Sequence, residues 1–148
     1  MKLYHGSPNG AIKVFERRQA NTGEHLPEPE TRNAIYLTND FGFALLAGAR
    51  PRGDGGGVYR PQGAAGNQMS FTDPSKFDPQ KEVFVYEWDS EMLPEGSFQE
   101  YGHQVIVDLD ELPAHEPVAY PAEKVFEYYE FTNWPQSPAE HLREMKLS

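Results

Sequence analysis

Short runs of β-favouring residues recur along this chain, and no regular series of helices separates them. The strongest run is EVFVYEW at residues 82–88, in which β-branched and aromatic residues dominate. Further strands are predicted at residues 2–5, 11–15, 34–38, 103–107 and 124–131. A doubly wound parallel sheet places a helix between successive strands, so this pattern argues against that architecture. The sequence predicts a strand-rich α+β fold with two or three short helices.

Two helices are predicted from residues that favour a helix start. Asn39 and Asp40 are good N-cap residues, and the apolar positions of residues 41–49 that follow them fit a short buried helix. Residues 137–140, SPAE, combine an N-cap serine, a proline at the first helical position and a capping-box glutamate. They predict a second helix over residues 138–146.

Two segments lack the periodicity of either element. Residues 16–33 carry glycine, proline, asparagine and many charged residues, which predicts a loop. Residues 51–80 are rich in glycine and proline and contain few aliphatic residues. We expect a long loop there that is too poor in apolar groups to contribute to a core.

Length and composition place the chain among small proteins of a reducing compartment. Its 148 residues suit a single domain, residues 1–148, and it contains no cysteine, which excludes disulfides, thiolate zinc sites and cysteine nucleophiles. We expect a cytoplasmic protein. The first residues have no apolar run of signal-peptide length, and no stretch is apolar enough to span a membrane, so we expect neither secretion nor membrane insertion.

The charge is strongly acidic and unevenly distributed. Asp and Glu total 23 against 13 Lys and Arg, which gives a formal charge of −10, and the acidic excess lies after residue 82. Such a surface disfavours non-specific nucleic-acid binding because it repels phosphate backbones. Six arginines nevertheless lie in the first 60 residues, at positions 17, 18, 32, 50, 52 and 60. Two interpretations stay open: solvated loop arginines, or an N-terminal half that meets an anion such as a dinucleotide.

Common catalytic motifs are absent from the sequence, and one histidine stands out. There is no GxGxxG after a strand, no phosphate-binding GxxxxGK[ST], no GxSxG and no HExxH. His5 lies on a predicted strand and is followed by Gly6, which allows a ligand to approach the main chain closely. The other histidines have no second ligand at metal-site spacing, so no metal is expected. Taken alone, His5 fits a structural role as well as a functional one.

His5 and Tyr36 together lie in a recognisable pattern. LYHGS near the start is followed some thirty residues later by IYLT, which leads directly into an alanine-containing helix. The pattern resembles the ADP-ribosyltransferase fold of the His-Tyr-Glu class, and within it the small rifampin ADP-ribosyltransferases. Four stretches carry the resemblance: KLYHGSPNGAIKV, NAIYLTNDFGFALLAGA, EVFVYEWDSEMLPE, and EPV at 116–118 followed by a strand ending in FTNW and by PAEHLREM. They occur in the family's order and cover roughly half of the chain.

The resemblance implies a single ADP-ribosyltransferase-like domain of two small packed mixed or antiparallel sheets, with NAD as cosubstrate. Cleavage of the nicotinamide–ribose bond leaves an oxocarbenium-like ribose, which negative potential stabilises. His5 would hydrogen-bond the adenosine ribose, Gly6 would offer its backbone to the carboxamide, and Tyr36 would stack on the nicotinamide. Three further residues are assigned to the cofactor site: Ser7, Thr38 and Phe43.

The acidic member of the class has more than one candidate here. Counting back from residues 116–118, Glu111 falls where related small members carry their glutamate, and it is the preferred catalytic carboxylate. The rifampin enzymes are described as using an acidic residue in the loop after the FVYE-like strand, and an ungapped count places Glu95 there. Glu100 and Gln104 are further candidates.

The predicted function is NAD-dependent mono-ADP-ribosyl transfer. The acceptor would be a small molecule, for which a rifamycin-type antibiotic is the example, or a protein target of a toxin or phage effector. Two alternatives stay open. One is a catalytically silent module that binds NAD or ADP-ribose or acts only in interactions, and the other is a small acidic structural protein.

Overall fold

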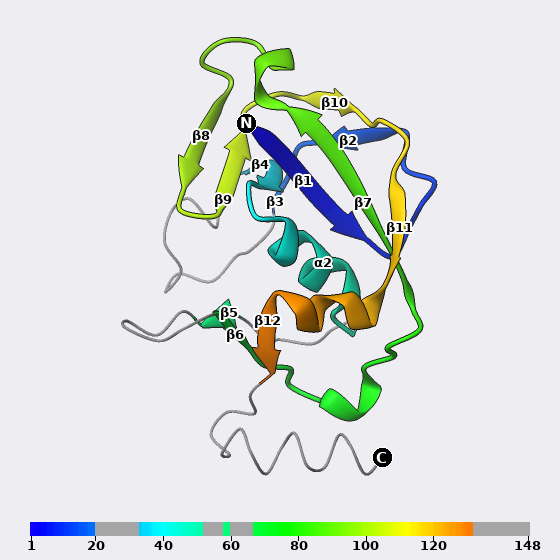
Figure 1. Ribbon diagram of the computed structural model, residues 1–148. Coiled ribbons are helices and arrows are strands. Elements are labelled where there is room, and N and C mark those ends of the chain that lie inside the picture. Colours follow the sequence, from blue (N-terminus) through cyan, green and yellow to red (C-terminus); the bar gives the residue numbers. More distant parts are fainter. Residues whose placement is uncertain (20–32, 52–57, 60–66, 132–148) are drawn as a thin grey trace.

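A computed structural model of this chain describes residues 1–19, 33–51, 58–59 and 67–131. They form the mixed α+β structure that the sequence predicts, mostly antiparallel strands with a few short helices (Figure 1). The strands are β1 (Lys2–Ser7), β2 (Val14–Glu16), β3 (Arg18–Gln19), β4 (Asn33–Thr38), β5 (Val58–Tyr59), β6 (Asn67–Met69), β7 (Glu82–Asp89), β8 (Phe98–Tyr101), β9 (Gln104–Val107), β10 (Glu111–Pro113), β11 (Val118–Pro121) and β12 (Tyr129–Phe131). The helices are α2 (Phe41–Ala49) and the 3₁₀ turns η1 (Pro74–Lys76), η2 (Ser90–Met92) and η3 (Ala122–Glu127).

One large sheet organises the described strands. It has seven strands in the order β11-β7-β1-β4-β9-β8, with β3 paired to β4, and all of its pairs are antiparallel. A two-stranded sheet pairs β10 with β2. A third sheet joins β12, β6 and β5, and in it β12 runs parallel to β6.

Different elements cover the two faces of the large sheet (Figure 1). Helix α2 and η3 pack on one face, where Leu45 of α2 and Val125 of η3 share a buried cluster with Val83 of β7. The strands β2 and β10 cover the other face, and Phe15 and Leu112 bury their side chains there against β1, β7 and β9. Because β1 is central, alternate side chains along it enter the two different cores.

The close contact between α2 and β1 requires glycine. A β-carbon on Gly6 would overlap the backbone carbonyl of Ala44, and one on Gly48 would come within 2.5 Å of the Val83 side chain. Tyr4 lies on the same face of β1 as Gly6 and packs on Phe41 at the start of the helix, with ring centroids 5.4 Å apart. His5 therefore lies on the face of β1 opposite the helix.

Several predicted elements are confirmed. Strands are present at the predicted runs of residues 2–5, 34–38, 82–88 and 103–107, and β2 overlaps the predicted run of residues 11–15. The helix over residues 41–49 is confirmed with its cap: the Asp40 carboxylate accepts a hydrogen bond of 3.2 Å from the amide of Phe43. The helix predicted over residues 138–146 lies outside the described residues.

Three expectations were wrong. Residues 124–131 were expected to form one strand, but η3 occupies residues 122–127, because Ala122 and Val125 bury their side chains at a spacing of three before β12 begins. The segment 51–80 does contribute to the core, through Met69 and Phe71, and it contains β5, β6 and η1. The predicted loop at residues 16–33 contains β3.

We predict that Gly6→Ala destabilises the protein by about 3 kcal/mol, because the added methyl group meets backbone rather than a movable side chain. Urea unfolding would measure the change. Gly96→Ala is the matched control, since Gly96 has φ +79° but open space around it, and should cost about 1 kcal/mol of backbone strain. Equal stability of Gly6→Ala and the wild type would contradict this account of the helix contact.

Candidate functional site

The site lies where two neighbouring strands separate. Strands β1 and β4 are joined by a register pair between Tyr4 and Thr38. Beyond this pair β1 continues on the β7 side and β4 continues on the β9 side. His5 follows Tyr4 along β1, and Tyr36 precedes Thr38 along β4. Both residues therefore lie on the side of the pair where the strands diverge.

A pocket of about 380 Å³ occupies this position, and His5 and Tyr36, the two residues on which the sequence assignment depends, both line it. The Tyr36 side chain leaves β4 on the face of Thr38 and Tyr4, because its neighbours Ile35 and Leu37 are buried in the core on the His5 face. Tyr36 therefore meets His5 through its main-chain carbonyl. Ser7, also predicted for the cofactor site, lines the same pocket. The remaining lining residues come from the segment around β2 and from β4: Ile12, Val14, Phe15, Glu16, Arg18 and Ile35.

The geometry around His5 determines its tautomer. Its Nδ1 lies 3.4 Å from the carbonyl oxygen of Tyr36. Because a carbonyl only accepts hydrogen bonds, Nδ1 carries the proton and donates. The ring also packs edge to face on Phe15, with centroids 4.7 Å apart. In the neutral ring, Nε2 is therefore an acceptor held in a fixed orientation.

Burial keeps His5 neutral. Removal of the ring from water lowers the pKa of His5 below 6.5; the hydrogen bond to Tyr36 opposes this change, and the charge of Arg18 adds to it. The imidazole is consequently uncharged near pH 7. An uncharged ring can accept a hydroxyl hydrogen through Nε2, which imidazolium cannot do.

Tyr86 fixes the segment that forms one wall of the pocket. Its side chain is fully buried in β7, its hydroxyl donates to the carbonyl oxygen of Asn9 at 2.8 Å, and the amide of Ile12 donates to the same hydroxyl at 3.0 Å. Phe15 then packs on the Tyr86 ring, with centroids 5.2 Å apart. A core tyrosine thus positions the chain that contacts His5.

Two glutamates lie side by side near the pocket. Register pairing places Glu111 of β10 directly opposite Glu16 of β2. Their neighbours Phe15 and Leu112 are buried in the core, so both carboxylates lie on the other side of the ribbon and are exposed. Glu16 lines the pocket, whereas Glu111 is adjacent to it through this pairing.

Arg17 holds these two strands against β4. Its guanidinium contacts Asp108 at 2.7 Å and Asp110 at 3.2 Å, and it donates to the carbonyl oxygen of Asn33 at 3.0 Å. Arg17, next to Glu16, and Asp110, next to Glu111, are thereby tied to Asn33 at the start of β4, the strand that carries Tyr36.

The other predicted cofactor residues have structural partners. Gly6 is buried beneath α2. The Thr38 hydroxyl donates to the carbonyl oxygen of His103 at 2.6 Å and accepts from the amide of Asp40 at 3.1 Å. The Phe43 ring packs on His103, with centroids 4.3 Å apart. None of these three lines the pocket of His5 and Tyr36.

The remaining acidic and amide candidates lie on other elements. Glu95 is exposed in the turn between η2 and β8. Glu100 lies on β8, where its carboxylate accepts a hydrogen bond of 3.3 Å from Asn39, and Gln104 is paired with Thr38 on β9. They are not among the residues that line the pocket.

Sequence reasoning missed Glu16 and Arg18 as site residues. Both lie beyond Phe15, where the predicted strand ended, in a segment expected to be a loop. A short strand that continues to Glu16 and resumes at Arg18 carries little periodic signal. The described part of the chain contains no group of three or more His, Asp or Glu side chains that could hold a metal ion. Nor does a described helix have the length and apolar character needed to cross a membrane.

No protein-family model matches this chain, and no curated protein or solved structure matches it either.

We predict that His5 contributes a pH-dependent part of the stability. Since its pKa is lower in the folded protein than in the unfolded chain, this stability is complete above about pH 6.5 and is lost as the pH falls through the folded pKa. His5→Gln should therefore lose less stability than the wild type between about pH 7.5 and pH 5 in urea unfolding. A larger loss in His5→Gln would contradict the lowered pKa.

Tyr86→Phe should destabilise the protein by about 1–3 kcal/mol, because it leaves the Ile12 amide and the Asn9 carbonyl without their shared partner. Tyr101→Phe is the control, since Tyr101 is exposed and lies on an edge strand. Its unfolding free energy should change by less than about 0.5 kcal/mol. Equal effects of the two substitutions would show that Tyr86 does not hold the pocket wall.

Proposed function

We propose that this chain is an NAD-dependent mono-ADP-ribosyltransferase of the His-Tyr-Glu class. The observation that carries the proposal is the pocket between β1 and β4, which is lined by His5 and by Tyr36, 31 residues apart in sequence, with the Tyr36 carbonyl accepting from the imidazole. Both residues are assigned to NAD by the resemblance of LYHGS and IYLT to that class. The common pocket is what such a site requires.

The architecture supports the same proposal. Beyond the pair of Tyr4 and Thr38, the large sheet consists of one half with β11, β7 and β1 and another with β4, β9 and β8. These halves would correspond to the two sheets of an ADP-ribosyltransferase fold, with the dinucleotide bound between them. The chain from residue 1 to 148 would then be one such domain.

The pocket residues suit the parts of NAD. His5, neutral and with Nδ1 donating to Tyr36, would accept a ribose hydroxyl hydrogen through Nε2. The resemblance assigns Tyr36 to stacking on the nicotinamide ring, although its side chain leaves β4 on the face opposite His5 and only its carbonyl meets the imidazole. Arg18, exposed at the pocket, would attract the pyrophosphate, which favours the interpretation of the N-terminal arginines as anion-binding.

A carboxylate is needed where positive charge develops on the ribose. When the nicotinamide–ribose bond breaks, its electron pair leaves with nicotinamide, and an oxygen or nitrogen of the acceptor then bonds the ribose carbon and releases a proton. Glu16 in the pocket and Glu111 beside it would stabilise the cationic ribose, and one of them could accept that proton. This pairing favours Glu111 over Glu95 among the predicted residues and adds Glu16.

The acceptor would be a small molecule, such as a rifamycin-type antibiotic, or a protein modified by a toxin or phage effector. NAD would be the cosubstrate, with no metal, and the reaction would take place in the cytoplasm. A second candidate function is a catalytically silent module that binds NAD or ADP-ribose. One observation favours it: Glu95 and Glu111, the predicted catalytic carboxylates, are both exposed and do not line the pocket.

We predict that the purified protein releases nicotinamide from NAD and that Tyr36→Ala and His5→Ala each lower the rate at least about tenfold. Chromatographic measurement of nicotinamide would show this. Of the carboxylate variants, Glu16→Gln and Glu111→Gln should reduce the rate, while Glu95→Gln should match the wild type because Glu95 lies in another turn.

Calorimetric titration with NAD separates the candidate functions. Binding without nicotinamide release, with or without an added acceptor, would favour the silent module. If the protein neither binds NAD nor releases nicotinamide, both candidate functions are contradicted. Loss of a rifamycin on incubation with NAD would identify a small-molecule acceptor, whereas labelled lysate proteins would identify a protein one.

A further inference from the structure

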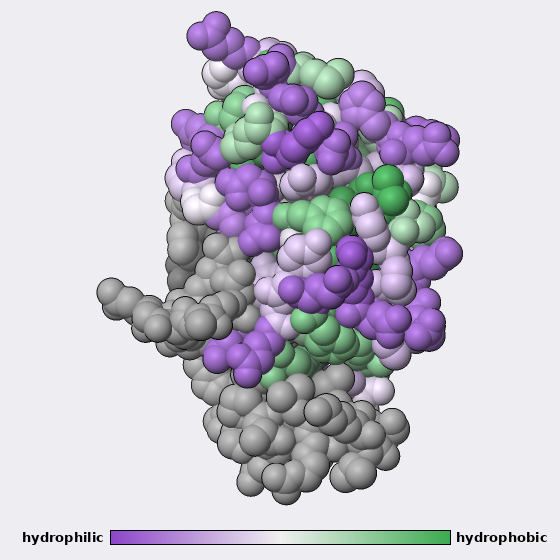
Figure 2. Space-filling model, in the orientation of Figure 1, coloured by the Kyte–Doolittle hydropathy of each residue, from purple (hydrophilic) through white to green (hydrophobic). Residues whose placement is uncertain are grey.

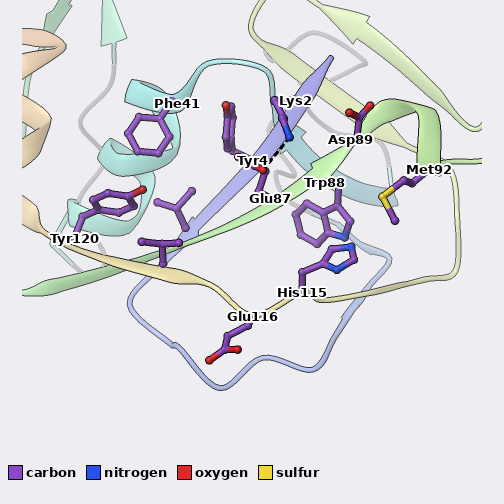
Figure 3. A pocket seen from close by; sticks show the side chains of 12 residues that line it. Lys2, Tyr4, Phe41, Glu87, Trp88, Asp89, Met92, His115, Glu116 and Tyr120 are labelled. Atoms are coloured by element: carbon purple, nitrogen blue, oxygen red, sulfur yellow. Dashed lines mark hydrogen bonds and ion pairs between the residues drawn. The ribbon is translucent and has the colours of Figure 1, made fainter.

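A second pocket, of about 330 Å³, lies on the face of the large sheet that carries Tyr4 (Figure 3). It is formed by β1, the first residue of α2, β7, η2 and the segment from His115 into β11. Figure 2 shows this face, where apolar side chains are exposed over β1, β7 and β11 among hydrophilic ones. Val118 and Met92, which line the pocket, are 55% and 66% exposed.

Aromatic rings form much of the wall. Phe41 packs edge to face on Tyr4 and Tyr120, with centroids 5.4 and 5.3 Å apart, and these three rings lie together on one side in Figure 3. Trp88 and His115 also line the pocket, next to Met92 in Figure 3, but the Trp88 indole is buried in the opposite core, with its ring centroid 5.2 Å from that of Phe15. Such a surface buries apolar groups, and its ring faces attract cations.

The charged groups that line the pocket are mainly acidic. Glu87, Asp89 and Glu116 contribute three carboxylates. Glu87 is bonded to Lys2 at 3.2 Å, and Asp89 lies 3.6 Å from the amino group of Met1. Glu116 is exposed, and no described residue forms an ion pair with it. The pocket thus retains a net negative charge within a protein whose formal charge is −10.

We propose that this pocket binds a small organic cation, a substituted ammonium whose positive charge is surrounded by apolar groups. The aromatic wall, Val85 and Val118 would contact the substituents, and the ring faces would stabilise the charge. Glu116, whose carboxylate points away from the rings in Figure 3, would add to the negative potential from a distance. An anion such as NAD is disfavoured here by the three carboxylates.

A fully substituted ammonium fits better than a primary amine or a guanidinium. Those two groups require hydrogen-bond acceptors, and two of the three carboxylates are already engaged by Lys2 and Met1. A quaternary ammonium has no N–H to satisfy. The chain itself contains one cation placed on this aromatic group, since the Lys124 ammonium lies 5.9 Å from the centroid of the Tyr120 ring.

The test uses benzyltrimethylammonium as the probe, with benzyl alcohol as the neutral control and benzenesulfonate as the anionic control. Binding to the full chain would be followed by amide chemical shifts in NMR titrations. We expect saturable shifts in β1, β7 and β11 with the cation, at least about tenfold weaker binding of the alcohol, and none of the sulfonate.

Two exposed charges allow changes of opposite sign without disturbing the core. Glu116→Gln should weaken binding of the probe about threefold to tenfold, and Lys2→Met should strengthen it, because a repelling charge is removed. Glu95→Gln, which removes an exposed carboxylate outside the pocket, is the matched control and should leave binding unchanged.

Three outcomes would overturn the proposal. They are equal binding of the cation and the alcohol, shifts located around His5 instead of this face, or identical affinities in Glu116→Gln, Lys2→Met and the wild type. Phe41→Leu, which keeps an apolar side chain but removes the ring, should weaken binding of the cation more than binding of the alcohol. Equal loss of affinity for the two probes would show that the Phe41 ring contributes apolar burial and no attraction for the cation, against the proposal. The test is independent of NAD turnover.

Discussion

The close contact between helix α2 and strand β1 determines how this molecule is arranged. It exists because Gly6 and Gly48 have no side chains, so the helix backbone can lie against the strand. With the helix on that face, Tyr4 turns toward Phe41, and His5 turns toward Phe15 on the other face. One strand thereby contributes to two pockets of different chemistry, a histidine pocket on one face and an aromatic, acidic pocket on the other.

The histidine pocket also depends on Tyr86 and Arg17, which do not line it. Tyr86 anchors the segment from Asn9 to Ile12 by two hydrogen bonds, and Arg17 ties the end of β2 to β4. The divergence of β1 and β4 provides the space between them. A neutral His5 with a fixed tautomer results from this scaffold, since burial lowers its pKa and the Tyr36 carbonyl fixes its proton on Nδ1.

Local sequence patterns predicted the elements whose formation depends on residues close together in the sequence. The Asp40 cap, the helix after it and the strand around EVFVYEW carry strong local signals, and so do the runs at residues 2–5 and 34–38 that carry His5 and Tyr36. Long-range packing was not predictable in the same way. Met69 and Phe71 join the core from a segment with few apolar residues, and η3 forms in an aromatic run because Val125 packs against the α2 side of the sheet. Glu16 was missed because only strand pairing places it beside Glu111.

We propose that the space between β1 and β4 holds a dinucleotide whose ribose meets His5. A crystal structure with a non-hydrolysable NAD analogue tests it most directly. We expect a ribose hydroxyl within hydrogen-bond distance of His5 Nε2, the nicotinamide ring against Tyr36, and Glu16 or Glu111 near the other ribose. An analogue bound elsewhere on the molecule, or a His5 that contacts no part of it, would rule out a dinucleotide site at this pocket.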